Sequence, residues 1–483
     1  MMIKTVTSLK LAITLLAVNI LVGATSFNTY INYQQIYAQN VDDDTNTNSD
    51  TDGNSISFTK PINLTNNTRD SVYGQVASYK NNVYVVWQEN NPDSFHDNKA
   101  NSIYNNYRNY DIYIKKSIDG GLTFSKEINL SNNPGFSEHP QVAISGNNVY
   151  VAWTDDNTLS SSATISKNKE ILFRKSIDGG NTFDKIINLS NSSNADSYNQ
   201  EVAAAENNVY IVWQDTIGPT ADYDTASSIN ADNNSDRISS ISGKKNSSIV
   251  LRASTDGGNT FEKVKKLSNN AFESYPKITA FENSAYVVWN VGIIGDVSHD
   301  DNSSSNNIHN GIFFTKSLDN GNSFSDTIKL TSDWSSIGES QIAVYGNNVY
   351  VVWGGNPDEK VVGNMFFVKS SDNGDSFLQP LSLTDEKNSL NVEVIADKNN
   401  IVYVAWQALL PDGNEEILFK KSSDNGATFT NTNENISKNQ GISECTSIAV
   451  SENNKVYVIW EDDTFGNHEI LFAKNISNWD KNR

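Results

Sequence analysis

A strongly apolar strand pattern recurs seven times along the chain. Each copy leads into a tryptophan, as in the run from Val349 to Trp353, and the seven tryptophans are Trp87, Trp153, Trp213, Trp289, Trp353, Trp406 and Trp460. Because side chains alternate along a strand, Val349, Val351 and Trp353 face one way, and Tyr350 and Val352 face the other. A strand that is apolar on both faces needs cover on both.

Each tryptophan strand has regular neighbours. A shorter apolar strand such as 341–344 precedes it, and an Asn-rich turn such as 346–348 joins the two. Asn tolerates positive φ and suits a tight hairpin. A third apolar strand such as 417–419 follows, and then a fourth such as 185–189, so one repeat is a four-stranded meander of about 50 to 75 residues.

Seven such meanders bury both faces of every sheet if they pack radially around an axis. We therefore predict an all-β, seven-bladed β-propeller of four-stranded antiparallel blades over residues 56–480. The seventh repeat ends before a fourth strand, whereas residues 56–65 resemble residues 122–131 of the first repeat. The N-terminal strand is thus expected to complete the last blade and remove an exposed sheet edge.

A second motif, Ser-x-Asp-x-Gly-x-(Thr/Ser)-Phe, joins the third and fourth strands in six repeats. Its carboxylates are Asp119, Asp178, Asp256, Asp319, Asp372 and Asp424. An Asp side chain can accept hydrogen bonds from the backbone of its own turn, and the following Gly permits positive φ. Repetition in register with the blades favours a structural turn over a metal or phosphate loop.

These residues carry a resemblance to a known family. The chain resembles the Asp-box (BNR-repeat) propellers of the sialidase superfamily over about residues 55–480. The resemblance implies the propeller fold. It implies activity only where a site is present, because function resides in a site rather than in a fold.

Sialidases of this superfamily typically hold the substrate carboxylate with three arginines and use a Tyr nucleophile paired with a Glu, and an Asp acid/base. The Arg-Ile-Pro motif that usually supplies the first arginine is absent, and the chain has only six arginines. The weak catalytic candidates are Arg69, Arg108 and Arg237, all in connections between strands. We therefore favour a binding or interaction scaffold, with an exo-sialidase-type glycoside hydrolase as the alternative.

Long insertions mark one face of the predicted propeller, at residues 90–110, 155–169, 215–247 and 291–310. Variable loops on a rigid scaffold commonly carry binding function. Candidate ligand-binding residues on this face lie two positions after a repeat tryptophan or just before an innermost strand: Glu89, Asp155, Asp215, Asp462, Glu138, His139, Glu339, Glu444, Tyr73, Tyr198 and Tyr275.

The candidate residues suit an extracellular glycan or protein ligand, since tyrosines stack on sugars and carboxylates accept hydrogen bonds. A solvated acidic surface is the alternative interpretation. Carboxylates also permit Ca²⁺ binding, but no other cofactor is expected. The five histidines show no zinc-ligand spacing, so no metal site is assigned from the sequence.

The N-terminus predicts export. Lys4 and Lys10 precede an apolar run over residues 11–24, which indicates a signal peptide within residues 1–38, cleaved after about residue 24 or 38 or retained as an anchor. Residues 39–55 form an acidic spacer expected to be disordered. We expect a secreted or cell-surface protein, and a monomer.

The net charge limits the class of partner, and the cysteine content limits disulfide bonding. The net charge of −21 disfavours nucleic acid, because an acidic surface repels phosphate. The single cysteine, Cys445, excludes an internal disulfide and is expected to be a buried apolar residue.

Overall fold

The computed structural model describes residues 56–91, 110–133, 135–156, 168–192, 194–217, 246–268, 273–291, 311–332, 334, 336–356, 363–384 and 389–476. All of them belong to one compact unit, Asp50–Ile293 with Ser304–Arg483. The predicted signal peptide and spacer lie outside the described residues, as do Arg108, Arg237 and most of the four long insertions. The described part contains no helix that could cross a membrane.

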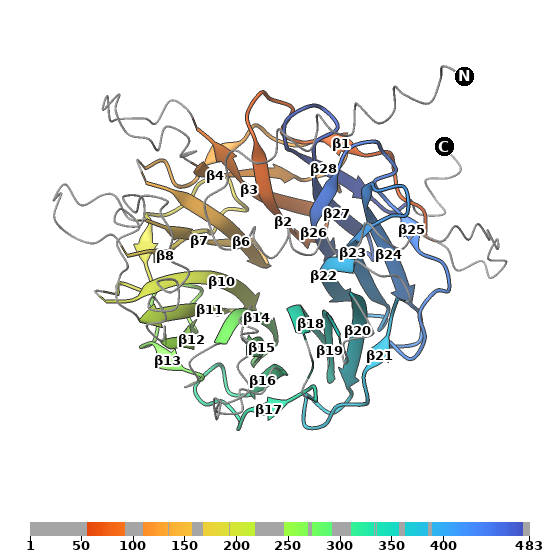
Figure 1. Cartoon of the computed structure of the whole chain (residues 1–483). Helices are drawn as coiled ribbons and strands as arrows, with labels where there is room; N and C mark the ends of the chain where they lie inside the picture. Colours follow the sequence, from red (N-terminus) through yellow and green to blue (C-terminus); the bar gives the residue numbers. More distant parts are fainter. Residues whose placement is uncertain are drawn as a thin grey trace, which may run out of the picture. The chain divides into compact units, whose positions relative to one another are not determined.

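The described residues form seven four-stranded antiparallel sheets arranged in a ring (Figure 1). The first strand of each sheet contacts the first strands of the two neighbouring sheets, so these seven strands line the centre. They are β2 (Ser71–Tyr79), β6 (Ser137–Ser145), β10 (Asp196–Ala205), β14 (Glu273–Phe281), β18 (Ser336–Tyr345), β22 (Ser389–Ala396) and β26 (Ser443–Val450). We number the blades 1 to 7 in this order.

The second strands carry the repeat tryptophans. They are β3 (Asn82–Asn90), β7 (Asn148–Asp155), β11 (Asn208–Ile217), β15 (Ser284–Val291), β19 (Asn348–Asn356), β23 (Val402–Leu409) and β27 (Val456–Asp462).

The third strands are β4 (Tyr110–Ser117), β8 (Glu170–Ser176), β12 (Asn246–Ser254), β16 (Gly311–Ser317), β20 (Asn364–Ser370), β24 (Glu415–Ser422) and β28 (Glu469–Lys474). The outermost strands are pairs of residues: β5 (Ile128–Asn129), β9 (Ile187–Asn188), β13 (Lys265–Lys266), β17 (Ile328–Lys329), β21 (Leu381–Ser382), β25 (Glu434–Asn435) and β1 (Ile62–Asn63).

The core lies between the blades. On β19, Val349, Val351 and Trp353 pack against blade 4, whereas Tyr350 and Val352 pack against blade 6. All seven repeat tryptophans are at most 1% exposed. The two apolar faces predicted for this strand are therefore confirmed, and each serves a different neighbour.

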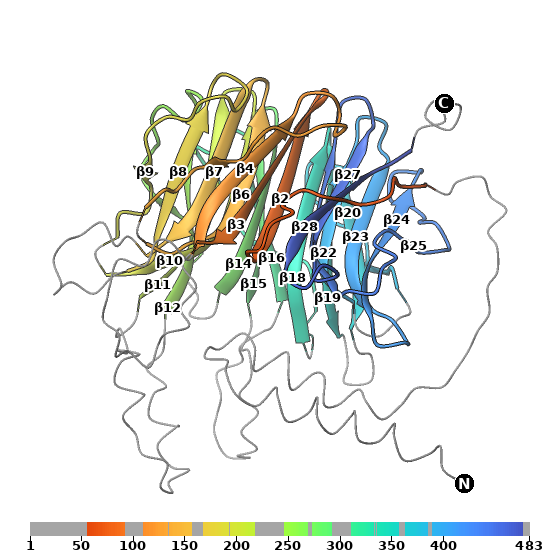
Figure 2. The ribbon, with the colours of Figure 1, turned by 90° about the horizontal axis from the view of Figure 1, so that it is seen from above.

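The ring closes as predicted. β1 pairs with β28, with Ile62 opposite Phe472 and Asn63 opposite Leu471, and so supplies the fourth strand of blade 7. Figure 2 shows β27 and β28 beside β2, where the last and first blades meet. The paired segment is shorter than the expected strand 56–65, although a bridge between Phe58 and Asn475 extends the contact.

The six Ser-x-Asp-x-Gly turns have one common geometry. In the first, Asp119 Oδ1 accepts hydrogen bonds from the backbone N–H groups of Leu122 and Thr123, both at 3.0 Å. Asp119 Oδ2 accepts one from the Thr123 hydroxyl at 2.6 Å. These hydrogen bonds from Thr123, with another from Ser117, hold the pKa of Asp119 well below its usual range. The carboxylate thus accepts its hydrogen bonds from groups of its own turn.

Candidate functional site at the channel mouth

Every innermost strand contains a β-bulge near its start, at the end where the links between blades enter. The register against the second strand shifts after Val72, Glu138, Tyr198, Ser274, Ile337, Leu390 and Glu444. We call the ring of residues around these bulges the channel mouth. Bulges often re-aim side chains beside functional sites.

Six bulges place a residue other than glycine at positive φ: Tyr73, His139, Asn199, Tyr275, Asn391 and Cys445. Asn adopts this conformation readily, so Asn199 and Asn391 need no special explanation. Bulky residues there cost about 1 to 3 kcal/mol each, and such strain concentrates at functional sites. The strained aromatic and sulfur-bearing positions fall on blades 1, 2, 4 and 7.

Polar side chains one position after the repeat tryptophans form hydrogen bonds with the bulge backbone of the neighbouring blade. Gln88 Oε1 of blade 1 accepts a hydrogen bond from the His139 backbone N–H of blade 2 at 2.7 Å. Asn290 Nδ2 of blade 4 donates to the Gly338 carbonyl of blade 5 at 2.6 Å. The corresponding residue of blade 7, Glu461, accepts a hydrogen bond from the Tyr73 backbone N–H of blade 1.

Glu461 is the only charged residue at this position. The other six blades have Gln88, Thr154, Gln214, Asn290, Gly354 and Gln407 there. Glu461 is 3% exposed, and burial followed by the charge of Glu444 raises its pKa to about 8. One blade thus has an acid where the other six have a neutral residue.

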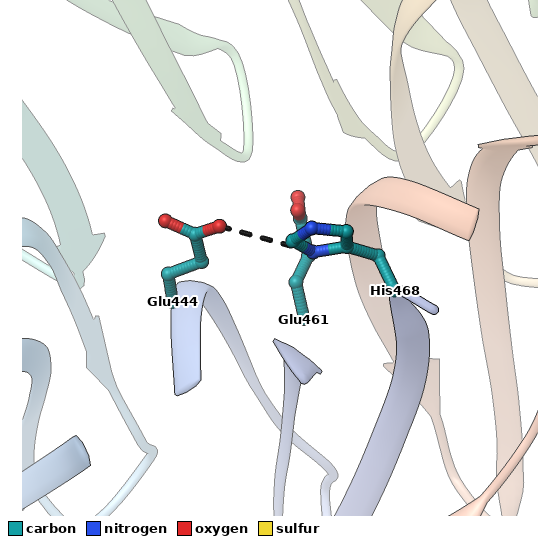
Figure 3. A group of neighbouring side chains, drawn as sticks. All are labelled: Glu444, Glu461 and His468. Carbon is teal, nitrogen blue, oxygen red and sulfur yellow. Dashed lines mark ion pairs between the residues drawn. The ribbon is translucent and has the colours of Figure 1, made fainter. Parts of the chain in front are cut away.

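Two further side chains of blade 7 converge on Glu461 (Figure 3). Glu444 comes from β26, and His468 directly precedes β28. Donor atoms of the three residues all lie within 4.8 Å of one another. The closest approach of His468 Nδ1 to Glu444 Oε1 is 3.9 Å, which is too long for a hydrogen bond. We call these three residues the Glu-Glu-His cluster.

Tyr73 and His139 form an aromatic pair beside this cluster. Their ring centroids are 4.4 Å apart, and Tyr73 is 42% exposed. Burial, with smaller contributions from Cys445, Glu461, Glu444 and Glu138, raises the pKa of the Tyr73 phenol well above its usual value. Tyr73 is thus partly exposed to solvent and keeps its hydroxyl protonated at neutral pH.

Cys445 does not match the apolar environment expected for it. It is half-buried, and its sulfur lies 3.9 Å from Asn391 Nδ2. Burial, and then the nearby carboxylate of Glu461, raise the pKa of its thiol. The thiol therefore stays protonated at neutral pH and is poorly nucleophilic.

A second ring of polar residues lines the channel one layer deeper. Its members are Gln75, Gln141, Glu201, Lys277, Gln341, Glu393 and Ser447, each opposite the residue that precedes a repeat tryptophan. Lys277 Nζ lies 3.2 Å from Glu201 Oε2, and Gln341 Nε2 donates to Glu393 Oε1 at 2.6 Å. Burial raises the pKa of Glu393 to about 8.

The structure brings the sequence-predicted site residues together in two groups. Tyr73, Glu138, His139 and Glu444 lie near one another at the junction of blades 1, 2 and 7, as their mutual electrostatic effects show. Tyr198, Tyr275 and Glu339 form the second group, where burial and then Glu339 raise the pKa of Tyr275 to about 12. The first group also contains Glu461 and His468, which the sequence analysis did not select.

The four acids two positions after a tryptophan do not form an exposed rim, because Glu89, Asp155 and Asp462 are buried inside the blades and Asp215 is half-buried. Asp155 Oδ2 accepts hydrogen bonds from the Trp153 indole at 3.3 Å, the Ser137 hydroxyl at 2.8 Å and the Asn133 amide at 2.8 Å. Glu89, Asp215 and Asp462 accept equivalent bonds from the indoles of Trp87, Trp213 and Trp460.

The remaining three blades test this role. Where the acid is replaced by Val291, Gly355 or Ala408, the indole nitrogens of Trp289, Trp353 and Trp406 are buried with no hydrogen-bond partner in the described structure. The acids therefore satisfy buried donors within their blades, a structural role that explains their position.

The described arginines do not converge. Arg69 forms an ion pair with Glu89, with Nη2 3.0 Å from Oε1. Arg174 donates to the carbonyls of Leu130, Phe183 and Asp184. Arg252 lies on the third strand β12. Within the described ranges, no arginine occupies an innermost strand.

The comparisons with known proteins concern the fold. No family model and no curated protein matches the chain. Among solved structures, the chain is similar to a protein of unknown function from Dyadobacter fermentans, with 13% identity and a TM-score of 0.49 over 87% of this chain and 98% of the other.

Two sialidases are also similar in structure. For Trypanosoma rangeli sialidase in complex with 2,3-difluorosialic acid, the identity is 13% and the TM-score 0.45, over 86% of this chain and 56% of that one. For a Hadza microbial sialidase the values are 12% and 0.43, over 75% and 73%. The chain thus spans little more than half the length of the trypanosomal protein.

Proposed function

We propose that this protein is an exported, sialidase-like propeller that binds a carbohydrate at the channel mouth and does not hydrolyse sialosides. The observation that carries the proposal is the exposed Tyr73 ring, held at positive φ against His139 and beside the carboxylates of blade 7. A strained, exposed aromatic residue on a rigid strand is suited to contact with a ligand rather than to core packing.

The chemistry of the mouth suits a neutral or amino sugar. An aromatic ring can stack on the apolar face of a sugar, and carboxylates such as Glu138 and Glu444 can accept hydrogen bonds from hydroxyl or ammonium groups. The same carboxylates repel a sialic acid carboxylate. Of the described arginines, Arg69 and Arg174 are already engaged with protein groups, and Arg252 lies on the third strand β12 rather than at the channel mouth, so none of the three is placed to clamp a carboxylate there.

One observation favours the second candidate, a sialidase-type hydrolase. Tyr73 lies beside Glu461 and Glu444, and a Tyr–Glu pair is the nucleophile arrangement of that superfamily. Against it, the raised pKa of the phenol disfavours the phenolate that would attack the sugar.

The first experiment measures hydrolysis of a fluorogenic sialoside by the purified mature chain, with and without divalent cations. We expect no turnover above the uncatalysed rate. Turnover that is lost in the variant Tyr73→Phe would replace the binding proposal with the hydrolase.

The second experiment measures glycan binding on an array, followed by calorimetry with the best ligand. We expect Tyr73→Asn to weaken binding by about tenfold, which corresponds to a stacking contribution of about 1.4 kcal/mol. Asn is chosen because Asn199 and Asn391 occupy the equivalent bulge position at positive φ, so the fold should be retained.

The matched control is Tyr79→Asn, at the opposite end of the same strand β2. Equal affinity of the Tyr73 and Tyr79 variants for the glycan would contradict a site at the channel mouth. Export is tested separately, by the N-terminal sequence of the protein recovered outside the cell.

A further inference from the structure

We propose that Glu444, Glu461 and His468 form a binding site for one divalent transition-metal ion, Zn²⁺ or Mn²⁺. The three residues come from consecutive strands or the link between them, and Glu444 stands directly opposite Glu461 in the β26–β27 pair. This site goes beyond the proposed glycan binding, because the affinity for the metal can be measured without any sugar.

The first argument is the identity of Glu461. Its structural task, to accept a backbone N–H from the next blade, is performed at the same position by the neutral Gln88 of blade 1. Burial of a carboxylate is unfavourable when a neutral amide performs the same task. An acid at 3% exposure therefore has an advantage over glutamine only where a cation binds it, and a metal ion is such a cation.

The second argument is the state of His468. Its Nδ1 atom is buried and has no hydrogen-bond partner in the part of the chain that the structure describes. The nearest carboxylate oxygen, of Glu444, is 3.9 Å away. An imidazole nitrogen without a hydrogen-bond partner is available to bind a metal ion, since imidazole is the commonest nitrogen ligand of metals in proteins.

The distances suit a shared ion. Zinc bonds to nitrogen and carboxylate oxygen are about 2.0 to 2.2 Å long, so donors on one ion lie roughly 3 to 4 Å apart. The donors here already lie within 4.8 Å of one another, so a shared ion requires them to approach by only about 1 to 2 Å. Because the ligands sit on or beside strands of one sheet, the backbone holds them close together before any ion binds.

The ligand set selects the class of metal. Ca²⁺ and Mg²⁺ prefer oxygen ligands alone, whereas imidazole with carboxylates suits Zn²⁺ and Mn²⁺. Three protein ligands leave coordination positions for water or for a hydroxyl of a bound ligand. Since Tyr73 lies beside this cluster, a metal here would contact what the channel mouth binds.

The competing explanation is a simple ion pair between protonated His468 and Glu444. The two explanations differ in one measurable property, the saturable binding of a metal ion. The experiment is isothermal titration calorimetry of the untagged, chelator-treated full-length mature chain with Zn²⁺ alone and with Mn²⁺ alone, in a background of excess Ca²⁺ and Mg²⁺.

We expect one high-affinity ion per chain. The variants Glu461→Gln and His468→Ala should each weaken this binding by roughly tenfold or more. Glu461→Gln should fold normally, because glutamine occupies the equivalent position in blades 1, 3 and 6. The matched control Glu262→Gln removes one exposed carboxylate outside the cluster and should leave the affinity unchanged.

Binding of wild-type strength in both cluster variants would overturn the proposal, as would the absence of a saturable site in the wild-type chain. Substitution with Co²⁺ gives an independent readout, because its visible absorption reports ligation by nitrogen and oxygen. A spectrum unchanged between wild type and His468→Ala would equally overturn it. If the wild-type chain binds the metal ion but no glycan, the glycan proposal alone is contradicted.

Discussion

At the scale of single residues, the seven blades serve as controls for one another. Four have an acid two positions after the tryptophan, and there the indole N–H is hydrogen-bonded. Three lack the acid, and there the indole has no partner among the described residues. The consequence of one side chain can thus be read from the chain's own repeats.

Blade 6 provides the sharpest test, since it has both groups that donate hydrogen bonds to this acid in other blades, the Trp indole and a Ser hydroxyl. Ser389 Oγ and Trp406 Nε1 are buried and unpaired in the described structure, next to Ala408. We expect Ala408→Asp to raise the free energy of unfolding by about 1 to 2 kcal/mol, because one carboxylate satisfies both groups. Urea denaturation at neutral pH measures this.

The reverse substitution, Asp155→Ala, is its control. It leaves the Trp153 indole and the Ser137 hydroxyl without their shared acceptor, and should lower stability by about 2 to 4 kcal/mol. A destabilising Ala408→Asp would show that the desolvation of a carboxylate outweighs the two hydrogen bonds in blade 6.

The channel carboxylate Glu393 should make stability depend on pH. Burial raises its pKa in the folded protein to about 8, against the lowering effect of Lys277 and with the raising effects of Glu201 and Glu339. Because the folded state binds the proton more tightly, this contribution to stability is complete below about pH 4.5 and is lost as the pH rises toward 8.

We therefore expect Glu393→Gln to match the wild type near pH 4.5 and to exceed it above pH 8. The gain should be about 2 to 3 kcal/mol, less than the full shift implies, because Glu393 is only partly buried and channel water screens it. Chemical denaturation at several pH values gives the comparison. A difference that is constant across pH would contradict the assignment.

At the scale of elements, the Ser-x-Asp-x-Gly turns dock one blade onto the next. Gly121 of blade 1 has φ +75°, and a Cβ atom there would lie 2.4 Å from the Phe472 ring of blade 7. Phe124, which closes the same motif, makes an edge contact with Phe472 at 5.1 Å between centroids. The motif thus fixes both its own turn and a contact between blades.

Gly121→Ala should therefore lower the free energy of unfolding by about 2 to 4 kcal/mol, the sum of a strained φ and a steric clash. Gly146→Ala is the control, because Gly146 also has positive φ but no atom within 4 Å of the added Cβ. It should cost only about 1 kcal/mol. Equal losses of stability in the two variants, measured by thermal unfolding, would show that the contact with the Phe472 ring does not contribute to the effect of Gly121→Ala.

The fold and part of the site could be predicted because their sequence signals are local. The tryptophan period and the Ser-x-Asp-x-Gly motif were sufficient for the blades, since both patterns are local. Tyr73, Glu138, His139 and Glu444 were selected as candidates because they were expected just before innermost strands, and they lie within the first residues of those strands. Glu461 was not, because its role appears only when the seven positions after each tryptophan are compared.

Alternation along the strand also explains the displaced acids. Residues two apart share a face, so Asp155 follows Trp153 into the space between blades and not to the rim. The sequence expectation followed the position of the loop rather than this alternation. The deeper ring that contains Glu201 and Lys277 was missed because a bulge shifts which face each later residue takes.

At the scale of the whole molecule, a short N-terminal strand holds the ring closed. Leu64 follows β1 and is buried in the core between blades 7 and 1. Leu130 and Leu189 occupy the equivalent buried positions in blades 1 and 2. The last blade thus uses the same side chain from the opposite end of the sequence.

We expect Leu64→Ala to lower the free energy of unfolding by about 2 to 5 kcal/mol, as much as Leu130→Ala, because each opens a comparable cavity. Paired denaturation curves of the two variants test this. A loss below about 1 kcal/mol for Leu64→Ala alone would mean that the closure contributes little in solution.

The pairing of β1 with β28 also affects when the fold can be completed during synthesis. The segment that includes Thr65 leaves the ribosome 404 residues before its hydrogen-bonding partner Glu469. Until β28 has been made, β1 has no strand to pair with and blade 7 is incomplete. Every nascent or prematurely terminated chain is therefore an unclosed ring, and the fold is completed only when its last strand has been made.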